Sequence, residues 1–500
     1  MNYVLTPKQM QEVDRYTEYE LLIPSILLME HAALAVTTEV IRHHLQGCKV
    51  LVIAGRGNNG GDGLAVARQL LLKGYAVKIL LCCQVEDLTV DSTVNYQTLR
   101  SIDANIEIIS ELTETVKSEI ADADVVIDAL FGTGCNRMLT SFYAEMVEAI
   151  NQFSQKIIAI DIPSGLNGKS GIPMSTAVKA DKTVVLSQYK LGNLLGKAKH
   201  YCGEMVLADI GIPAKALQKL NSQVFLLTPD CWENYPVNDV FANKGSQGKL
   251  AVIAGCSQMG GALLLSAEAA YRSGVGLVYA YTSESNRIPL LTRLPEAIVN
   301  TYHDKSDRYD FYKIIEDKNA VLIGPGLSTN GQAYELLQMA ISSNLPLVID
   351  ADALNLMAEH PKLLHLCMVR SELKILTPHI KEMERLTGIS IPQIEANMVE
   401  VAQNYAEKWN AVIILKNHRT VIAFPNGKCY INLLGNEGMA TGGSGDVLSG
   451  YLAGLIASCQ NSEYEKAVLY GVYHHSLAGD MAMHDKGTKA MLASDIISKL

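Results

Sequence analysis

The stretch KVLVIAGRGNNGGDGLAVARQLLLKG, residues 49–74, decides the fold of the first half of the chain. Residues 49–55 form a short apolar run that ends in glycine, which indicates a buried strand. Residues 64–74 then show helical spacing of their apolar residues and end at Gly74, a natural helix stop. A buried strand that leads through glycines into a helix is typical of a parallel α/β sheet with a ligand at the strand end.

The same alternation of strand and helix recurs along the chain. In the first half the apolar runs are AVKILLC, ADVVIDALFG and KIIAIDIPSG. The rhythm lapses over residues 211–245, which hold three prolines, and restarts with KLAVIAG at residue 249. Later runs are AVLIGPG, PLVIDAD, LKILTP and NAVIILK. We therefore predict an α/β fold with two domains, residues 1–222 and residues 223–500. At the N-terminus, TPKQ predicts a helix capped by Thr6 and Gln9.

Composition excludes several classes of protein. The 500 residues are 48% hydrophobic and 19% charged, as in soluble globular proteins, and the formal net charge is −10. This charge, with no run of Lys and Arg, argues against a nucleic-acid partner. The sequence shows no apolar run of about 18 residues, no apolar core of a signal peptide and no C-x-x-C among its ten cysteines. We expect a cytoplasmic protein without a membrane segment.

Three predicted strands of the first half end in polar residues. The strand at 49–55 leads into GRGNNGGDG, a second strand leads into DALFGTGCNR with Asp128, and a third leads into DIPSG with Asp161 and Ser164. Ligands in open α/β sheets bind beyond such carboxyl ends. The glycines of GRGNNGGDG fit the G-x-G-x-x-G spacing of dinucleotide-binding folds, which is weak evidence by itself.

That fingerprint does not explain the two asparagines and the aspartate among the glycines. An asparagine carbonyl can ligate a hard cation, and Asp128 and Ser164 supply further oxygen ligands. A set made only of oxygens suits a hard cation better than zinc. The alternative is that Asn58 to Asp62 are turn residues, because Asn and Gly tolerate positive φ.

GNNGGDG, DALFGTG and DIPSG, in this order, resemble the NAD(P)H-hydrate epimerase family over roughly residues 1–220. That family interconverts the R and S forms of a nicotinamide cofactor hydrated on its ring, with a potassium ion near the site. The resemblance implies a Rossmann-like three-layer domain that binds the dinucleotide as substrate and not as hydride carrier. The implied substrate contacts are Asn58, Asn59, Gly60, Gly61, Asp62, Gly132, Thr133, Gly134, Arg137, Met138 and Asp161, of which Asp161 is also catalytic; the implied potassium ligands are Asn59, Asp128 and Ser164.

The sequence departs from this family at one place. Relatives often have MENAG on the first long helix, whereas this chain has MEHAA at residues 29–33. The change leaves Glu30 and His31 without an assigned role.

NEGMATGGSGDVLSG, residues 436–450, is the strongest local signal of the second half. Gly442, Gly443 and Gly445 free backbone N–H groups to converge at the start of the predicted helix DVLSGYLAGLIA, which makes an anion site. Asp446 lies in the first turn of that helix. A carboxylate there can take a proton from a hydroxyl while the anion site holds a phosphoryl group. The alternative is an ordinary acidic residue at a helix start.

This string resembles the G-x-G-D motif of the ribokinase-like superfamily. With GPGL (324–327), DADALN (350–355), LTPHIKEMERL (376–386) and SLAGD (476–480), it resembles the ADP- or ATP-dependent NAD(P)H-hydrate dehydratases over residues 222–500. The whole chain thus resembles the bifunctional NAD(P)H-hydrate repair enzymes, which combine an isomerase with a lyase. The resemblance implies a ribokinase-like α/β domain that phosphorylates the ring hydroxyl of the S hydrate, after which phosphate leaves.

The resemblance also implies roles for individual residues of the second half. Asp446 becomes the general base, and ADP is favoured over ATP as the nucleotide. Mg²⁺ is expected to neutralise phosphoryl charge, with Glu382 as a candidate to position it through water. Asn417 stands where relatives often have glycine, and asparagine accepts left-handed backbone geometry. The implied hydrate contacts are Ala262, Gly326, His379 and Asp446, and the implied nucleotide contacts are Lys416, Asn417, His418, Arg419, Thr420, Gly442, Gly443 and Gly445.

Two other functions fit parts of this sequence. The chain could be a small-molecule kinase of the ribokinase type fused to a regulatory nucleotide-binding domain, which would release a stable phosphorylated product. The N-terminal domain could also be a binding or scaffolding module, although Asp161 and NNGGD argue against that function. For the repair enzyme we expect small-molecule substrates, the hydrates of NADH and NADPH with ADP or ATP, and a homo-oligomer.

Overall fold

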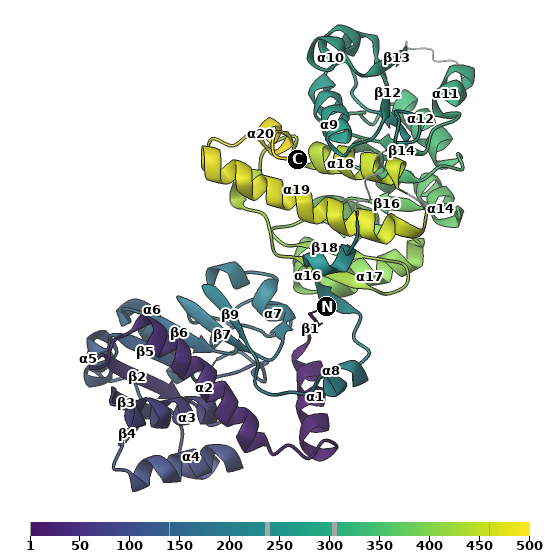
Figure 1. Cartoon of the computed structure of the whole chain (residues 1–500). Coiled ribbons are helices and arrows are strands. Elements are labelled where there is room, and N and C mark those ends of the chain that lie inside the picture. The colour runs from purple at the N-terminus through teal and green to yellow at the C-terminus, as the bar shows by residue number, and fades with distance from the viewer. Residues whose placement is uncertain (1, 140, 236–240, 303–307, 460) are drawn as a thin grey trace. The chain divides into compact units, whose positions relative to one another are not determined.

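The computed structural model describes residues 2–139, 141–235, 241–302, 308–459 and 461–500. The chain divides into two compact units, Asn2–Ser222 and Gln223–Leu500. Each unit is built on one large, mainly parallel sheet with helices around it (Figure 1), which confirms the predicted α/β class. In these described ranges no helix is long and apolar enough to cross a membrane.

The first unit has a seven-stranded sheet in which all neighbouring strands are parallel. The chain starts at the middle of the sheet and winds outward in both directions, so the order reverses between β2 and β5. Ligands bind at such a switch point in open α/β sheets. In spatial order the strands are β4 (Asn105–Ile108), β3 (Ala76–Leu81), β2 (Lys49–Ala54), β5 (Val125–Ala129), β6 (Ile157–Ile160), β7 (Lys182–Leu186) and β9 (Glu204–Ala208).

Helices cover both faces of this sheet, which makes a Rossmann-like unit of three layers. One face packs against the buried residues of α2, α3 and α4, and the other face packs against those of α5 and α6. A small sheet of β1 and β8 lies beside α1 and α8. The helices and the remaining strands are α1 (Pro7–Tyr19), α2 (Ser25–His43), α3 (Asn58–Leu72), α4 (Val90–Ser101), α5 (Glu114–Asp122), α6 (Ser141–Phe153), α7 (Leu191–Leu194), α8 (Ala214–Lys219), β1 (Val4–Leu5) and β8 (Tyr189–Lys190), with short 3₁₀ turns at η1 (Val85–Asp87) and η2 (Ala198–His200).

The starts of α1 and α3 test two local predictions. At α1, Thr6 and Gln9 form the expected capping box. At α3, however, the NNGGD residues are the first helical turns, because the helix begins at Asn58 after an extended Gly57. None of the residues 58–62 has positive φ, so the turn interpretation is wrong. The glycines serve close packing: a Cβ atom on Gly60 would overlap the carbonyl oxygen of Gly55.

The second unit has a ten-stranded sheet whose order reverses between β11 and β14. All neighbours are parallel except the β17–β18 and β18–β19 pairs. In spatial order the strands are β10 (Val224–Leu226), β19 (Cys429–Asn432), β18 (Thr420–Ala423), β17 (Val412–Leu415), β16 (Lys374–Leu376), β15 (Leu347–Ile349), β14 (Ala320–Ile323), β11 (Lys249–Ile253), β12 (Leu277–Ser283) and β13 (Ile298–Tyr302).

The long helix α18 organises this unit around its sheet. It packs on α9 and contacts β11, β14 and β15, which brings its N-terminus to the switch point. The helices are α9 (Gly260–Arg272), α10 (Arg287–Arg293), α11 (Arg308–Ile315), α12 (Gly331–Ile341), α13 (Asp352–Glu359), α14 (Pro361–Val369), α15 (Ile380–Thr387), α16 (Ile391–Ala396), α17 (Met398–Trp409), α18 (Ser444–Ser458), α19 (Tyr464–Lys486) and α20 (Ala493–Ile497), with 3₁₀ turns at η3 (Pro229–Trp232), η4 (Glu284–Asn286), η5 (Glu437–Met439) and η6 (Asn461–Glu463).

The stretch before residue 249 already belongs to the second unit. β10 pairs with β19, and Trp232 of η3 packs against the rings of Tyr470 and Tyr473 on α19. The segment 211–245, where the predicted alternation of strands and helices is interrupted, therefore contains an edge strand and an aromatic contact. Its residues 236–240 lie outside the described ranges.

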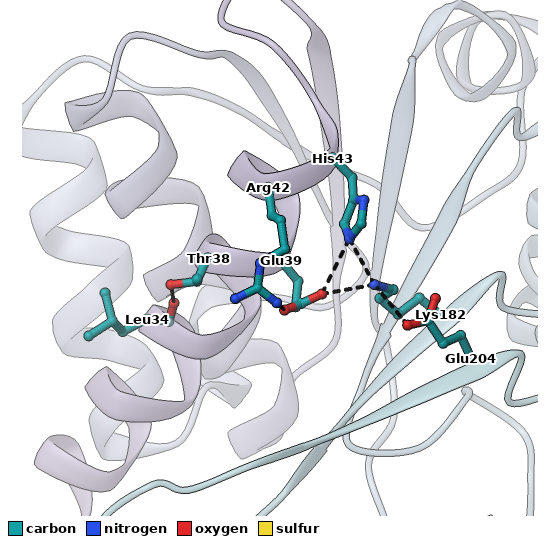
Figure 2. Close-up of polar contacts among 7 residues, drawn as sticks. All are labelled: Leu34, Thr38, Glu39, Arg42, His43, Lys182 and Glu204. Carbon is teal, nitrogen blue, oxygen red and sulfur yellow. Dashed lines mark hydrogen bonds and ion pairs between the residues drawn. The ribbon is translucent and has the colours of Figure 1, made fainter.

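A buried ion-pair cluster ties α2 to the amino end of the first sheet (Figure 2). Lys182 Nζ donates to Glu39 Oε2 at 2.8 Å and lies 3.1 Å from His43 Nε2. Arg42 contacts the other oxygen of Glu39, and Glu204 lies 3.5 Å from Lys182 Nζ. Because Lys182 and Glu204 are the first residues of their strands, this cluster lies at the opposite end of the sheet from the switch point.

Candidate active sites

The side chain of Asn59 is the clearest sign of a ligand in the first unit. It lies in the first turn of α3 and is 8% exposed. Among the described residues, neither its amide nitrogen nor its amide oxygen has a hydrogen-bond partner. Its Cβ atom lies 3.2 Å from the position that a Cβ on Gly132 would take, so it borders the loop after β5. A buried amide without a partner is costly, which points to a ligand that completes it.

Asp128 and Ser164 join the loops that follow β5 and β6. Ser164 donates to the Asp128 carboxylate twice, from its backbone N at 2.8 Å and from Oγ at 2.6 Å. Phe131 N in turn donates to Ser164 Oγ at 2.8 Å. Burial raises the pKa of Asp128 to about 6, although the Ser164 hydrogen bonds lower it. The structure thus brings two of the three predicted potassium ligands into contact and places Asn59 beside the same loop.

Asp161 follows β6 and has a strained backbone, with φ of 68°. Its carboxylate accepts hydrogen bonds from Lys190 Nζ and from Leu186 N. Lys190 is 1% exposed and also donates to the Leu186 carbonyl oxygen at 2.8 Å. Asn193 holds the Asp161 carbonyl oxygen at 3.0 Å. A fully buried lysine paired with a strained carboxylate is typical of functional sites.

Two further carboxylates lie near this ion pair. Burial, and then the charges of Asp161 and Asp14, raise the pKa of Asp62 well above its usual range. Asp14 comes from α1, and the sequence analysis assigned no role to Asp14 or to Lys190. The available signals were the capped helix that carries Asp14 and a lysine inside the otherwise buried run around residue 190.

The loop after β5 runs from the buried site to the surface. Gly132 lies beside Asn59, and the position of a Cβ on Gly134 lies 4.0 Å from Gln11 Nε2 of α1. Farther along the loop, Arg137 and Met138 are exposed, so their predicted substrate contacts lie at the rim.

The residues of MEHAA have structural partners. Glu30 is paired with Arg68 of α3 and also accepts a hydrogen bond from Gln69 Nε2 at 2.8 Å. His31 Nδ1 lies 3.0 Å from the carbonyl oxygen of Ile210. These contacts join α2 to α3 and to the segment after β9, which explains both residues without a ligand.

The second site surrounds the N-terminus of α18. Gly443 caps the helix with φ of 93°, and a Cβ there would overlap the side chain of Leu265. At Gly445 the position of a Cβ lies 3.3 Å from Lys416 Nζ. Lys416 Nζ donates to Asp350 Oδ1 at 2.8 Å. The helix start therefore combines the N–H groups of its first turn with a partly buried ammonium group, which suits an anion.

Asp446 lies at this helix start, in the first turn of α18. Burial raises its pKa to about 7; the charges of Asp350 and Asp352 add to the rise, and Lys416 opposes it. A carboxylate with this pKa can accept a proton near neutral pH. Asp350 is 1% exposed and is a site residue to which the sequence analysis gave no role.

His379 and Glu382 form a capping box at the start of α15. Glu382 N donates to His379 Nδ1 at 3.1 Å, and His379 N donates to Glu382 Oε2 at 2.8 Å. Burial raises the pKa of Glu382 to about 7 against the opposing charge of Lys416. Burial and the charge of Lys416 lower the pKa of His379. The box therefore lies within electrostatic reach of the anion site.

Ala262 and Gly326 meet at the switch point. A Cβ on Gly326, whose φ is 57°, would lie 2.9 Å from the Cβ of Ala262. Glycine is required here by both its backbone conformation and its close contact. These two predicted hydrate contacts thus lie together beyond β11 and β14.

The KNHRT hairpin joins β17 to β18. Asn417 does not have the positive φ expected for a glycine replacement; its Oδ1 instead accepts from His418 N at 2.8 Å and closes the turn. Arg419 Nη1 donates to the carbonyl oxygen of Leu433, so its guanidinium group braces the hairpin. Thr420 begins β18. The nucleotide contacts assigned to these residues stay predictions, with Lys416 nearest to the anion site.

SLAGD supports the loop before α18. Asp480 of α19 accepts from Asn436 Nδ2 at 2.8 Å and from Gly435 N at 3.0 Å. Asn436 Oδ1 accepts from Gly438 N at 3.0 Å. These bonds fix the path of the chain into the glycine-rich helix start.

Comparison with known proteins finds a family model that matches part of each unit. The NAD(P)H-hydrate dehydratase family model matches residues 250–500, and the model of the YjeF-related protein N-terminus matches residues 25–192. A bifunctional NAD(P)H-hydrate repair enzyme of Moorella thermoacetica is 35% identical, over 100% of this chain and 96% of that protein. The Coxiella burnetii enzyme of the same name is 34% identical, over 100% and 99%.

A solved structure resembles the second unit. It is a ribokinase-like superfamily protein of Enterococcus faecalis, 31% identical with a TM-score of 0.50, matched over 55% of this chain and 94% of that one. The full-length similarity to two repair enzymes and the two family models lead to one conclusion: this chain belongs to the bifunctional NAD(P)H-hydrate repair enzymes.

Proposed function

We propose that this chain repairs hydrated NADH and NADPH. Residues 1–222 interconvert the R and S hydrates, and residues 223–500 dehydrate the S hydrate with ADP or ATP. The observation that carries this proposal is Asp446, a carboxylate with a pKa of about 7 at a glycine-rich helix start, beside the partly buried Lys416–Asp350 pair. Full-length similarity to repair enzymes supports the choice of substrate.

The chemistry of the substrate explains why two activities belong in one chain. A reduced nicotinamide ring contains an enamine, and water adds to an enamine with the hydroxyl on the carbon bonded to nitrogen. Addition from either face gives two epimers at that carbon. Hydroxide is a poor leaving group, so its removal benefits from conversion to a phosphate ester. A site that phosphorylates only one epimer needs a second site to supply it.

In the second site, Asp446 takes the proton of the ring hydroxyl as its oxygen attacks the terminal phosphorus of the nucleotide. The nucleotide leaves with one phosphoryl group fewer, and its negative charge is held by the N–H groups of Gly442 to Gly445 and by Lys416. The C–O bond then breaks, and the electron pair leaves with phosphate while the ring nitrogen forms an iminium. Loss of a proton from the neighbouring carbon restores the enamine.

The donors around the anion site fit Mg²⁺. Magnesium is usually held by one or two carboxylates together with substrate phosphates and water. Asp350 and Glu382 lie within electrostatic reach of Lys416, and the described residues contain no cage of three ligating side chains. Glu382 would position the ion through water, and the ion would neutralise phosphoryl charge.

The donors of the first site fit potassium. Among the described residues Asn59 Oδ1 is buried without a partner, and the hydrogen-bonded Asp128 carboxylate and Ser164 hydroxyl come from the end of β5 and the loop after β6. Oxygen ligands from an amide, a carboxylate and a hydroxyl suit a hard monovalent cation. The ion would stabilise negative charge near the substrate, and Asp161 with Lys190 would exchange protons with its ring hydroxyl.

The test is recovery of NADH absorbance when the protein meets a mixture of R and S hydrates with ADP or ATP. Complete recovery that requires nucleotide supports the proposal. The glycine-rich helix start is also expected in a small-molecule kinase, which would leave a stable phosphorylated product and restore no absorbance. That result would replace the repair function with the kinase function. A control without nucleotide measures spontaneous recovery.

A further inference from the structure

Helix α1 forms one wall of the first site, although it precedes the segment matched by the family model, which begins at residue 25. A Cβ on Gly168 would lie 2.8 Å from Pro7 Cγ and 3.4 Å from Thr133 Cβ, and Gly134 lies beside Gln11. Pro7, Gln11 and Asp14 are spaced i, i+4 and i+7, so they share one face of the helix. This face lies along the loops that follow β5 and β6.

Asp14 is the carboxylate that this face brings to the site. Burial raises its pKa to about 6; Lys190 opposes the rise, while Asp161 and Glu18 add to it. Asp14 in turn raises the pKa of Asp62. No hydrogen bond or ion pair with another described residue holds the Asp14 side chain. The charged groups that surround it are therefore Lys190, Asp161, Glu18 and Asp62.

A structural role does not account for this arrangement. Asp14 does not cap α1, because Thr6 and Gln9 perform that function. The buried face of the helix, with Met10, Val13 and Thr17, is what packs into the unit. The second sign of a ligand is independent of Asp14: the buried amide of Asn59 also lacks a partner in the described chain, and it borders the loop that Gln11 contacts.

Building on the function proposed above, we propose that Asp14 is a catalytic residue of epimerisation, a second proton carrier that acts with the Asp161–Lys190 pair. The chemistry requires two carriers. Inversion at a carbon that bears nitrogen and hydroxyl proceeds when one acid protonates the hydroxyl and water leaves with the C–O electron pair. The nitrogen lone pair forms a planar iminium. Water then adds to the other face, and a base on that side takes its proton.

The two proton carriers exchange roles in the reverse direction, so each must gain and lose a proton. Asp161 is bonded to the ammonium group of Lys190. Asp14 lies in the same cluster without such a bond, and its raised pKa favours the protonated form at mildly acid pH. The cluster therefore contains two carboxylates with different partners, one bonded to an ammonium group and one not, which can serve as two distinct proton carriers.

The experiment uses the full-length protein without nucleotide, so that dehydration does not proceed. Purified R hydrate is supplied, and the appearance of S hydrate is followed by chromatography, with the spontaneous rate subtracted. Asp14→Asn is compared with wild type and with Glu12→Gln, an exposed carboxylate on the opposite face of α1. The dehydratase rate on S hydrate with ADP is measured on each preparation to show that the protein is intact.

We expect Asp14→Asn to lower kcat for epimerisation by about 100-fold, with KM changed by less than about threefold. Wild type should show a limb of the pH profile near pH 6, and this limb should disappear in Asp14→Asn, while Glu12→Gln keeps wild-type values. A rate within about threefold of wild type, an unchanged pH profile, or a rise in KM alone would overturn the proposal. If Asp14→Asn is insoluble, Asp14→Glu must retain more than about a tenth of wild-type kcat and shift that limb, and failure to do so counts against it.

A failure of the proposed function gives a different result. Wild-type protein that converts no R hydrate above the spontaneous rate contradicts the epimerase function itself. Wild-type protein that epimerises, together with an Asp14→Asn variant that does so equally well, contradicts only the role of Asp14.

Discussion

The two sites lie at equivalent places in their sheets but are built differently. Both occupy the carboxyl ends of strands where the strand order reverses. The second site is concentrated at one helix start, where Asp446 has no ion-pair partner among the described residues and has a pKa of about 7. The first site is assembled from α1, the start of α3, the loops after β5 and β6, and β8, and its central carboxylate, Asp161, is bonded to buried Lys190. A buried carboxylate without an ion-pair partner, such as Asp446, suits proton transfer but lowers the stability of the fold. A paired one, such as Asp161, can serve proton transfer and also stabilise the fold.

The largest expected effect is at Asp446. Asp446→Asn should lower the rate of dehydration by about 10²–10⁴-fold, since a general base typically contributes that much. Epimerisation should not change. In wild type the rate of dehydration should fall as the pH drops below about 7, because the base is then protonated. Recovery of NADH absorbance from pure S hydrate between pH 5.5 and 8.5 measures both effects, with Glu296→Gln, an exposed carboxylate, as control.

Stability sharpens this prediction. Because the pKa of Asp446 is raised by folding, its charged form opposes folding, and stability is lost as pH rises through about 7. Asp446→Asn should therefore be at least as stable as wild type at pH 8 in urea unfolding. An Asp446→Asn variant that is inactive and also much less stable than wild type would contradict the claim that Asp446 is a base whose charged form destabilises the fold.

Replacing Asp161, unlike replacing Asp446, should lower the stability of the fold as well as the activity of its site. Asp161→Asn should slow epimerisation by about 10²-fold and leave dehydration unchanged. It also leaves the buried ammonium group of Lys190 without a counter-ion, which should cost about 3 kcal/mol of unfolding free energy in the first unit. Urea unfolding of residues 1–222 and the conversion of R to S hydrate check the two parts. Full stability in this variant would show that the ion pair does not hold the site together.

The cation dependence of the two sites should differ as well. Replacing potassium by a bulky organic cation should slow epimerisation several-fold, and Asp128→Ala should abolish the response, because its carboxylate is one of three proposed oxygen ligands. Rates at matched ionic strength, with and without nucleotide, separate this effect from the Mg²⁺ requirement of phosphoryl transfer. Equal epimerisation rates in both salts would contradict the potassium site.

The smallest effect on activity is expected at the other end of the first sheet. Burial raises the pKa of Glu39, but the hydrogen bond from Lys182 and the charges of Lys182, Arg42 and His43 outweigh it and lower the pKa overall. The stability that this contributes is present above the usual pKa of glutamate and is lost as pH falls through the lowered value. Glu39→Gln should cost roughly 2–3 kcal/mol at pH 7, since Glu204 still contacts Lys182.

Catalytic rates of the Glu39→Gln variant should match wild type, because the cluster (Figure 2) lies at the amino end of the first sheet, whereas the first site lies at the carboxyl ends of its strands. Urea unfolding at pH 7 and pH 4 measures the effect on stability. A variant that loses epimerase activity while it remains folded would show that this cluster is structurally coupled to the site at the switch point.

The same comparison shows what could be predicted from sequence. The strands and the glycine-rich start of α18 could be predicted, because buried apolar runs and GGSGD are local patterns whose structure does not depend on distant residues. The alternative that NNGGD forms a turn, which rested on the tolerance of Asn and Gly for positive φ, was wrong, because Gly60 and Gly63 instead allow α3 to pack closely on Gly55 and Ala129. At this position tertiary packing overrides the local conformational preference of glycine.

Residues that only the fold brings together could not be found in this way. Lys190 is 29 residues from Asp161, and Asp14 lies on a helix that reads as an ordinary amphipathic segment. Asp350 was quoted within DADALN but becomes a site residue only through its bond to Lys416, 66 residues away. A single charged side chain carries no spacing signal, so its role depends on contacts that the sequence does not display.

The most direct test of the account is to separate the two units. Residues 1–222 and residues 223–500, the latter including β10 and Trp232, are expressed separately and given a mixture of R and S hydrates. With ADP or ATP, residues 223–500 alone should consume the S hydrate and leave the R hydrate, apart from slow spontaneous epimerisation. Addition of residues 1–222 should bring the reaction to completion. Consumption of both epimers at one rate by residues 223–500 alone would contradict the division of labour between the two sites.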